Sequence, residues 1–132
     1  MNNIIIPKIE LELPLAVSEN NYRRVVKGCS HPVISSEGRK YHENVKAIFR
    51  QSGQAAIKGK VKVTVEFYPP DRRRRDIDNL FKCLFDSLVA AGCIEDDSLI
   101  EELHAMKRAP MPGGLLFVRI EATQIFLEVK EK

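Results

Sequence analysis

The amino-acid sequence predicts an α/β (α+β) fold in which two main helices pack on a small mixed β-sheet. Residues 60–68 alternate between apolar and polar, as in a strand, and the apolar residues of 77–89 recur at helical spacing. Segments of these two kinds follow the order β-α-β-α-β-β, which favours a sheet with helices layered on it. Because 132 residues suit one domain and no repeat or linker interrupts the chain, we take residues 1–132 as a single domain.

The first half of the chain predicts one strand, one loop and one helix. Residues 8–13 (KIELEL) alternate as a strand does. Residues 16–35 contain several Asn, Gly and Pro residues that break regular structure, and they predict a loop. A pair of serines then supplies an N-cap for a helix over residues 37–52, and Gly53 follows near its end.

The second half predicts the central strand, the second helix and a C-terminal pair of strands. Residues 60–68 (KVKVTVEFY) are rich in β-branched residues, and two prolines end this strand. The helix with apolar residues from 77 to 89 ends at Gly92. Further strands are predicted at 99–107 and 115–121, with 124–129 either extending the last strand or forming another.

The composition excludes a disordered chain and a membrane span. Hydrophobic residues make up 44% and charged residues 30% of the chain, and no apolar run approaches the ~20 residues that a span requires. The three cysteines form no CxxC pair. They indicate packing roles in a reducing compartment, so we expect a cytoplasmic protein without membrane contact.

Charge is distributed unevenly along the sequence. Residues 19–62 carry ten Lys and Arg against three Glu, a net charge of +7, whereas residues 71–108 carry seven against nine acids, a net charge of −2. The basic half is either a solvated face or the binding surface for a polyanion.

A dense block of both charges lies between the central strand and the second helix. Four consecutive arginines, 72–75, precede Asp76 and Asp78. Residues two apart on a helix diverge, so the two carboxylates converge only if Asp76 lies outside the helix and Asp78 in its first turn. Lys82 follows four residues after Asp78, on the same side of the helix.

Ordinary structural roles also explain these acids. Asp76 suits the N-cap of a helix, and Asp78 with Lys82 suits a surface ion pair. Residues 96–98 (DDS) suit a turn before the next element. A helix of ~15 residues is ~22 Å long. Asp97 therefore joins the first two acids only if residues 93–97 return along the helix or if a second subunit supplies it.

If the three carboxylates do meet, their repulsion requires a cation. Several hard oxygen ligands suit Mg²⁺, and one or two such ions support phosphodiester cleavage. The arginines would then hold the polyanion, with 72 and 74 facing one way and 73 and 75 the other, and Lys82 would stabilise charge on the phosphoryl oxygens.

These motifs resemble the RusA family of Holliday-junction resolvases, small endonucleases of phage and prophage origin. The resemblance is densest over residues 69–100 and extends to 20–24 (NNYRR) and 35–45 (SSEGRKYHENV). It implies a homodimeric, structure-selective endodeoxyribonuclease of a bacterial or phage-infected cell. Such an enzyme resolves four-way DNA junctions by paired symmetric nicks in recombination and repair. The expected cofactor is Mg²⁺, with Mn²⁺ as a substitute, and no organic cofactor is expected.

The resemblance also assigns roles to residues of this chain. It implies that Asp97 joins Asp76 and Asp78 as a metal ligand, that Asp96 is a further candidate ligand, and that Lys82 is the catalytic lysine. The departure from the family's Pro-Pro-Ser approach, here PLAVSENN, leaves the path of residues 15–19 open. The residues expected near DNA are Asn21, Tyr22, Arg23, Arg24, Arg72, Arg73, Arg74 and Arg75.

Two rival functions remain on the sequence alone. A DNA-binding module without catalysis would use the arginines for phosphate contact and Asp76 as a cap. A Mg²⁺ phosphohydrolase acting on small phosphates would leave the +7 segment without a purpose. Among neighbouring residues, Asp86 is expected to orient Lys82 or to form a surface pair. We expect Cys83 to be buried, and His31, His42 and His104 to hold no metal.

Overall fold

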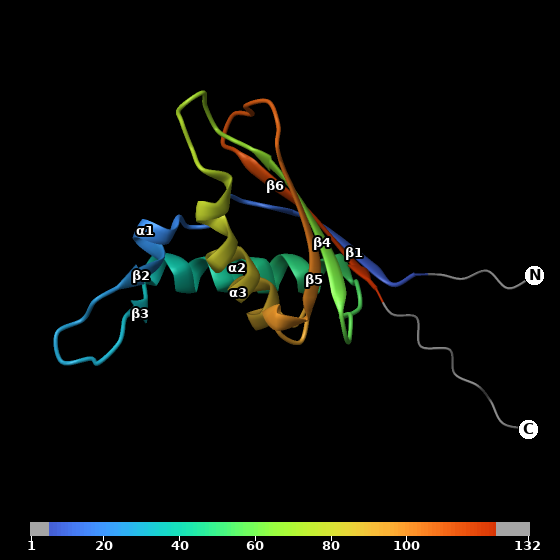
Figure 1. Cartoon of the computed structure of the whole chain (residues 1–132), viewed down its shortest axis with the longest axis horizontal. Coiled ribbons are helices and arrows are strands. Elements are labelled where there is room, and N and C mark those ends of the chain that lie inside the picture. The colour runs from blue at the N-terminus through green and yellow to red at the C-terminus, as the bar shows by residue number, and fades with distance from the viewer. Residues whose placement is uncertain (1–5, 124–132) are drawn as a thin grey trace, which may run out of the picture.

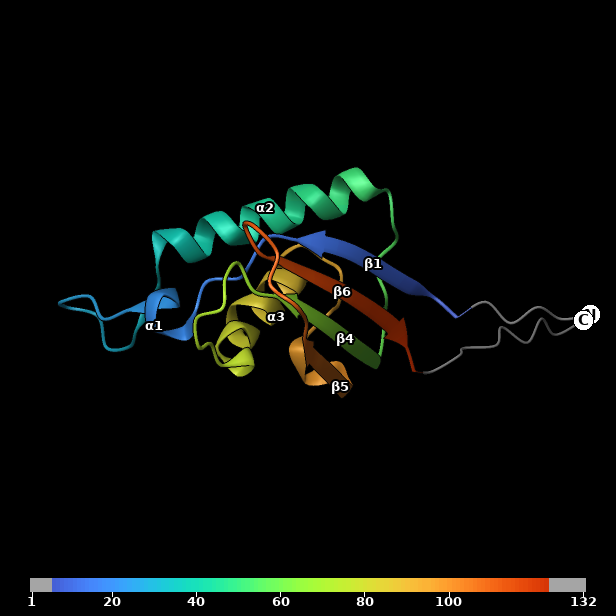
Figure 2. The same ribbon diagram turned by 90° about the horizontal axis from the view of Figure 1, so that it is seen from above.

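The computed structural model describes residues 6–123, which form a mixed four-stranded sheet with two long helices on one face (Figures 1 and 2). Across the sheet the strands lie in the order β1 (Lys8–Leu13), β6 (Leu115–Ala122), β4 (Val61–Tyr68) and β5 (Ile100–Lys107). The strands β1 and β4 pair antiparallel with β6, whereas β5 pairs parallel with β4. The predicted α/β fold with a mixed sheet is confirmed, and β5 forms one edge of the sheet.

The two long helices occupy the predicted positions. Helix α2 spans Ser36–Ser52, and its N-cap Ser35 accepts a hydrogen bond of 3.1 Å from the Gly38 amide. Gly53 ends this helix in the left-handed conformation, with φ of 69°, which glycine adopts without steric cost. Helix α3 spans Phe81–Ala90 and packs against α2. Its predicted first turn is instead a 3-10 helix, η1 (Ile77–Leu80).

The core lies between the helices and one face of the sheet. Every second side chain of β1, β4 and β6 is buried on this face, as the alternation predicts. Strand β5 differs, because both of its faces are largely exposed. The buried strand residues are Ile9, Leu11, Leu13, Val61, Val63, Val65, Phe67, Leu116, Val118 and Ile120.

The prediction of an unstructured loop over residues 16–35 is wrong. This segment contains the short helix α1 (Glu19–Tyr22) and a hairpin of β2 (Arg23–Arg24) with β3 (Val33–Ile34). Tyr22 anchors the segment, since its ring is only 1% exposed and packs against Gly38 of α2. Local secondary-structure propensity does not reveal such an anchor, because Tyr22 packs against a residue of a different element, Gly38 of α2.

The remaining elements complete the connections. A second 3-10 helix, η2 (Asp97–Leu99), leads into β5. The extra strand considered for 124–129 lies outside the described residues. None of the helices within residues 6–123 combines the length and the apolar character that a membrane span requires.

Candidate active site

Asp76 and Asp78 lie where β4 passes into the helical layer. Asp76 is extended, with φ of −86° and ψ of 128°, and directly precedes η1, while Asp78 lies within η1. The prediction that Asp76 stands outside the helix is therefore confirmed. Its carboxylate makes no capping hydrogen bond, which contradicts the role of a helix cap. Both carboxylates are exposed and available to a ligand from solvent.

Lys82 is held by an extended polar network. Its Nζ lies 3.1 Å from Asp86 Oδ1, one turn further along α3. The hydroxyl of Tyr22 donates to Asp86 Oδ2 at 2.8 Å and lies 2.8 Å from Nε2 of His42. The expected pairing of Asp86 with Lys82 is confirmed. The contributions of Tyr22 and His42 were missed, because these residues come from α1 and α2.

The ionisation of this network follows from burial. Burial, followed by the hydrogen bond to Asp86, raises the pKa of Tyr22 well above its usual value, so the phenol stays protonated. Burial also lowers the pKa of His42. Since the phenol has one proton and gives it to Asp86, the Nε2 of His42 must donate to the phenol oxygen. The network thus fixes one oxygen of Asp86 and leaves the other for Lys82.

The four arginines form a bend rather than an extended strand. Asp71 accepts a hydrogen bond of 2.9 Å from the backbone N–H of Arg73 and pairs with the guanidinium of Arg75 at 3.2 Å. These contacts lower the pKa of Asp71, and the hydrogen bond from the Arg73 backbone makes the largest contribution. The segment is not an assigned strand, and Arg74 and Arg75 both line one cavity. Arg72, Arg73 and Arg74 are exposed.

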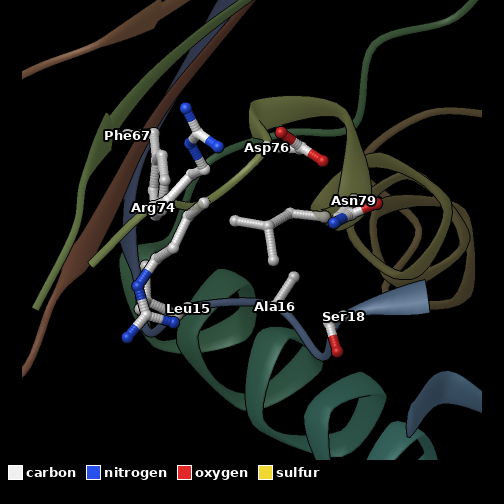
Figure 3. Close-up of a pocket in the computed structure, with 9 residues that line it drawn as sticks. Leu15, Ala16, Ser18, Phe67, Arg74, Asp76 and Asn79 are labelled. Carbon is white, nitrogen blue, oxygen red and sulfur yellow. The ribbon is translucent and has the colours of Figure 1, made fainter. Parts of the chain in front are cut away.

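That cavity lies directly beside Asp76 and has a volume of about 440 Å³ (Figure 3). Figure 3 shows Phe67 and Arg74 on one side of it and Asp76 and Asn79 on the other. The segment before α1 forms another wall. Sequence reasoning missed the cavity, because its walls come from three separate parts of the chain. The lining residues are Leu15, Ala16, Ser18, Phe67, Arg74, Arg75, Asp76, Asn79 and Leu80.

Asp97 lies at the other end of β5. Lys107, the last residue of β5, donates through Nζ to the carbonyl of Arg75, next to Asp76. Asp97 instead begins η2, which precedes the first residue of β5. Over the range 6–123, no three His, Cys, Asp or Glu side chains are grouped so that they could hold a metal ion. One chain by itself therefore does not gather the three acids.

Asp96, the neighbouring candidate ligand, serves the local turn. Its Oδ2 accepts a hydrogen bond of 3.3 Å from the backbone N–H of Ser98 and contacts the Ser98 hydroxyl. These contacts lower the pKa of Asp96, and the Ser98 hydroxyl makes the largest contribution. The positive charge of Lys82 lowers the same pKa by a smaller amount. The interpretation of Asp96 as a turn residue is supported.

The segment expected near DNA divides into exposed and buried residues. Asn21, Arg23 and Arg24 are exposed, and the loop between β2 and β3 projects from the body of the molecule (Figures 1 and 2). Tyr22 is buried and its hydroxyl is engaged inside the protein. This hydroxyl contacts Asp86, which in turn pairs with Lys82, so the buried phenol links α1 to the lysine of α3.

A known protein family matches most of this chain, including the candidate site. The family model described as "Endodeoxyribonuclease RusA" matches residues 13–121. The chain belongs to the RusA family. The predicted resemblance is confirmed, and the match contains every acid, lysine and arginine of the candidate site. The strands β4 and β5 and the two long helices fall within it.

Curated RusA relatives come from phages and bacteria. The crossover junction endodeoxyribonuclease rusA of Enterobacteria phage 82 is 39% identical over 111 residues, which cover 83% of this chain and 91% of that protein. RusA of Escherichia coli strain K12 is 37% identical over the same coverage. The rusA protein of Enterobacteria phage HK97 is 38% identical over 109 residues, 82% of this chain and 89% of its own.

Proposed function

We propose that this RusA-family chain is a crossover junction endodeoxyribonuclease that resolves four-way DNA junctions by Mg²⁺-dependent phosphodiester hydrolysis. The observation that carries the proposal is the exposed Asp76, which makes no capping hydrogen bond and stands in the sequence between the arginine block and Asp78, with Lys82 four residues after Asp78. A charge cluster that is merely solvated does not require carboxylates without partners together with so many cationic side chains. A nuclease requires both, because the carboxylates must bind a cation and the cationic side chains must bind the DNA backbone.

The donor set fits a hard divalent ion. In the described part of the chain, the side-chain oxygens of Asp76 and Asp78 make no hydrogen bond or salt bridge to the protein. Mg²⁺ is bound through a few carboxylates and keeps water and phosphate as its other ligands. When bound, the ion would supply an activated water and would stabilise negative charge on the phosphate. Mn²⁺ prefers the same oxygen ligands and is expected to substitute.

The third carboxylate is proposed to come from a second copy of the chain. Strand β5 is an edge strand of eight residues, and its outer side is unpaired within residues 6–123. Such an edge is a template for another strand. Antiparallel pairing of two β5 strands about a two-fold axis would bring the start of one beside the end of the other. Asp97 of one copy would then approach Asp76 of its partner.

This arrangement gives each charged residue a function. Lys82, fixed by Asp86, would stabilise negative charge on the phosphoryl oxygens. The exposed arginines would bind the neighbouring backbone phosphates, as would Arg23 and Arg24. A two-fold dimer would carry two sites related by the symmetry of a four-way junction, which suits paired nicks. The reduced cysteines suit the cytoplasm of a bacterial or phage-infected cell.

A labelled four-way junction and a linear duplex of the same sequence test this function. We expect nicking of the junction only when Mg²⁺ is present, and much weaker cutting of the duplex. Asp76→Asn should abolish nicking but retain junction binding, since it removes a ligand and a repulsive charge. A wild-type protein that binds the junction in Mg²⁺ without cutting it would instead establish the non-catalytic DNA-binding module.

A further inference from the structure

We propose that the cavity beside Asp76 binds a single nucleobase that has left the base stack at the branch point of the junction. The inference rests on the proposed function for its DNA substrate, and it assigns to this cavity a role separate from hydrolysis. Three properties of the cavity support it: its walls, its polar rim and its position.

The walls suit the flat face of an aromatic heterocycle. Leu15 and Leu80 are half-buried at the cavity, while Phe67 and Ala16 are 2% and 6% exposed and close it off from the core. The volume of about 440 Å³ falls within the range of ~300–1,000 Å³ that ligand pockets occupy. Enzymes that extrude a base receive it in pockets of this kind, between apolar or aromatic side chains.

The rim favours a base with hydrogen-bond acceptors on its edge. Arg74 and the Asn79 amide supply donors around the cavity (Figure 3), and Arg75 also lines it. Within the described residues, Nε of Arg75 is a buried nitrogen without a hydrogen-bond partner. A buried donor that lacks an acceptor is costly, so a small rotation of Arg75 toward a ring nitrogen or carbonyl oxygen would be favourable. All four bases present such acceptors, so the rim would hold a base without selecting one.

The position links the cavity to the scissile phosphate. Asp76 both lines the cavity and belongs to the proposed metal site. The base held there would therefore belong to a nucleotide that borders the phosphate being cut. Arg74, which is exposed at the rim, would contact the same nucleotide.

Base capture would also explain a preference for junctions. Extruding a base from a duplex costs a few kcal/mol, and the cost is smallest where pairing or stacking is already disturbed. At the branch point each terminal pair has lost a continuous stacking neighbour on its own strand. The cavity would thus be filled readily at a junction and rarely on linear DNA, which would place the cut at the branch.

Fluorescence of 2-aminopurine, which brightens when the base leaves the stack, tests the inference without catalysis. The probe is placed at each position around the branch point, or in one arm, and the protein is added to saturation in EDTA. We expect a severalfold rise at one branch-point position and little change in the arm. Because no metal is present, a failure of the nuclease proposal would not affect this result.

Variants then locate the base in the cavity. Ala16→Leu, which fills the cavity, and Arg74→Ala, which removes a rim donor, should both lose the rise at saturating protein. Arg108→Ala removes an exposed charge that does not line the cavity and that pairs with Glu66, so it should keep the rise. Circular dichroism checks that each variant is folded. If Ala16→Leu does not fold, Arg74→Ala alone tests whether the cavity holds the base. An unchanged signal in wild type at every branch-point position, or a rise that survives Arg74→Ala, would overturn the inference.

Discussion

The Tyr22 hydroxyl donates a hydrogen bond of 2.8 Å to Asp86 Oδ2, joining two residues that are 64 positions apart. The other oxygen of Asp86 holds Nζ of Lys82 at 3.1 Å. The buried tyrosine therefore determines where the exposed side of α3 presents its lysine. This relationship supports a prediction about the chemical step.

We expect Tyr22→Phe to lower the single-turnover cleavage rate about 10-fold while junction binding is unchanged. A hydrogen bond to a charged group contributes ~1.5–3 kcal/mol, and ~1.4 kcal/mol corresponds to a factor of 10 in rate. The matched control is Tyr41→Phe, which removes another buried phenol whose hydroxyl donates to the Pro14 carbonyl outside this network. Equal losses in both variants would point to stability rather than to positioning of Lys82.

Subunit mixing tests whether Asp97 is contributed by a partner. Asp76→Asn and Asp97→Asn homodimers should each be inactive. If each site is built from both subunits, one site of a mixed dimer contains both substitutions and the other site contains neither. Random exchange should therefore restore nicking to about a quarter of the wild-type level. If each site were built from one chain, every site in the mixture would carry a substitution and no activity would return.

The edge of β5 should be required for dimer formation. Leu103 lies in the middle of this strand and is 41% exposed, although it is a large apolar residue. Near a two-fold axis, Leu103→Asp would place like charges close together, so we expect sedimentation velocity to show monomers without nicking activity. Val25→Asp is the control, since Val25 is 87% exposed on the distant hairpin. A Leu103→Asp protein that stays dimeric would move the interface elsewhere.

The salt dependence of binding should identify the arginines that bind phosphate. Removing one arginine–phosphate ion pair should make the slope of log affinity against log salt concentration shallower by about 0.9. We expect this change for Arg72→Ala and for Arg73→Ala. Arg108→Ala should leave the slope unchanged, because its guanidinium pairs with Glu66 at 2.7 Å. Slopes that are identical in all three variants would remove the arginine block from the DNA interface.

Thiol labelling should distinguish the three cysteines. Burial raises the pKa of Cys83 to about 11 and that of Cys93 to about 12, so little reactive thiolate forms on either at pH 8. Cys29 is exposed. We expect one thiol per chain to react rapidly in the folded protein and three to react after denaturation. Fast labelling of more than one thiol would show that the packing around α3 opens.

The sequence by itself determined the four strands of the main sheet and the two long helices, and it permitted the placement of Asp76 outside the helix. These features follow from local rules: alternation of apolar residues, their helical spacing and the capping residues at each end. The 3-10 geometry of η1 was not predicted, because the same apolar spacing is compatible with the first turn of an α-helix.

Only the tertiary structure decided which distant residues meet. Tyr22 reaches Asp86 because α1 packs beside α3, and Leu15 faces Arg74 because the chain after β1 passes the end of β4. Strand order likewise placed β5 at an open edge, with Asp97 at the opposite end from the strand residue that contacts Arg75. Such contacts depend on how whole elements pack and on the burial gained when they do, which no local pattern of residues contains.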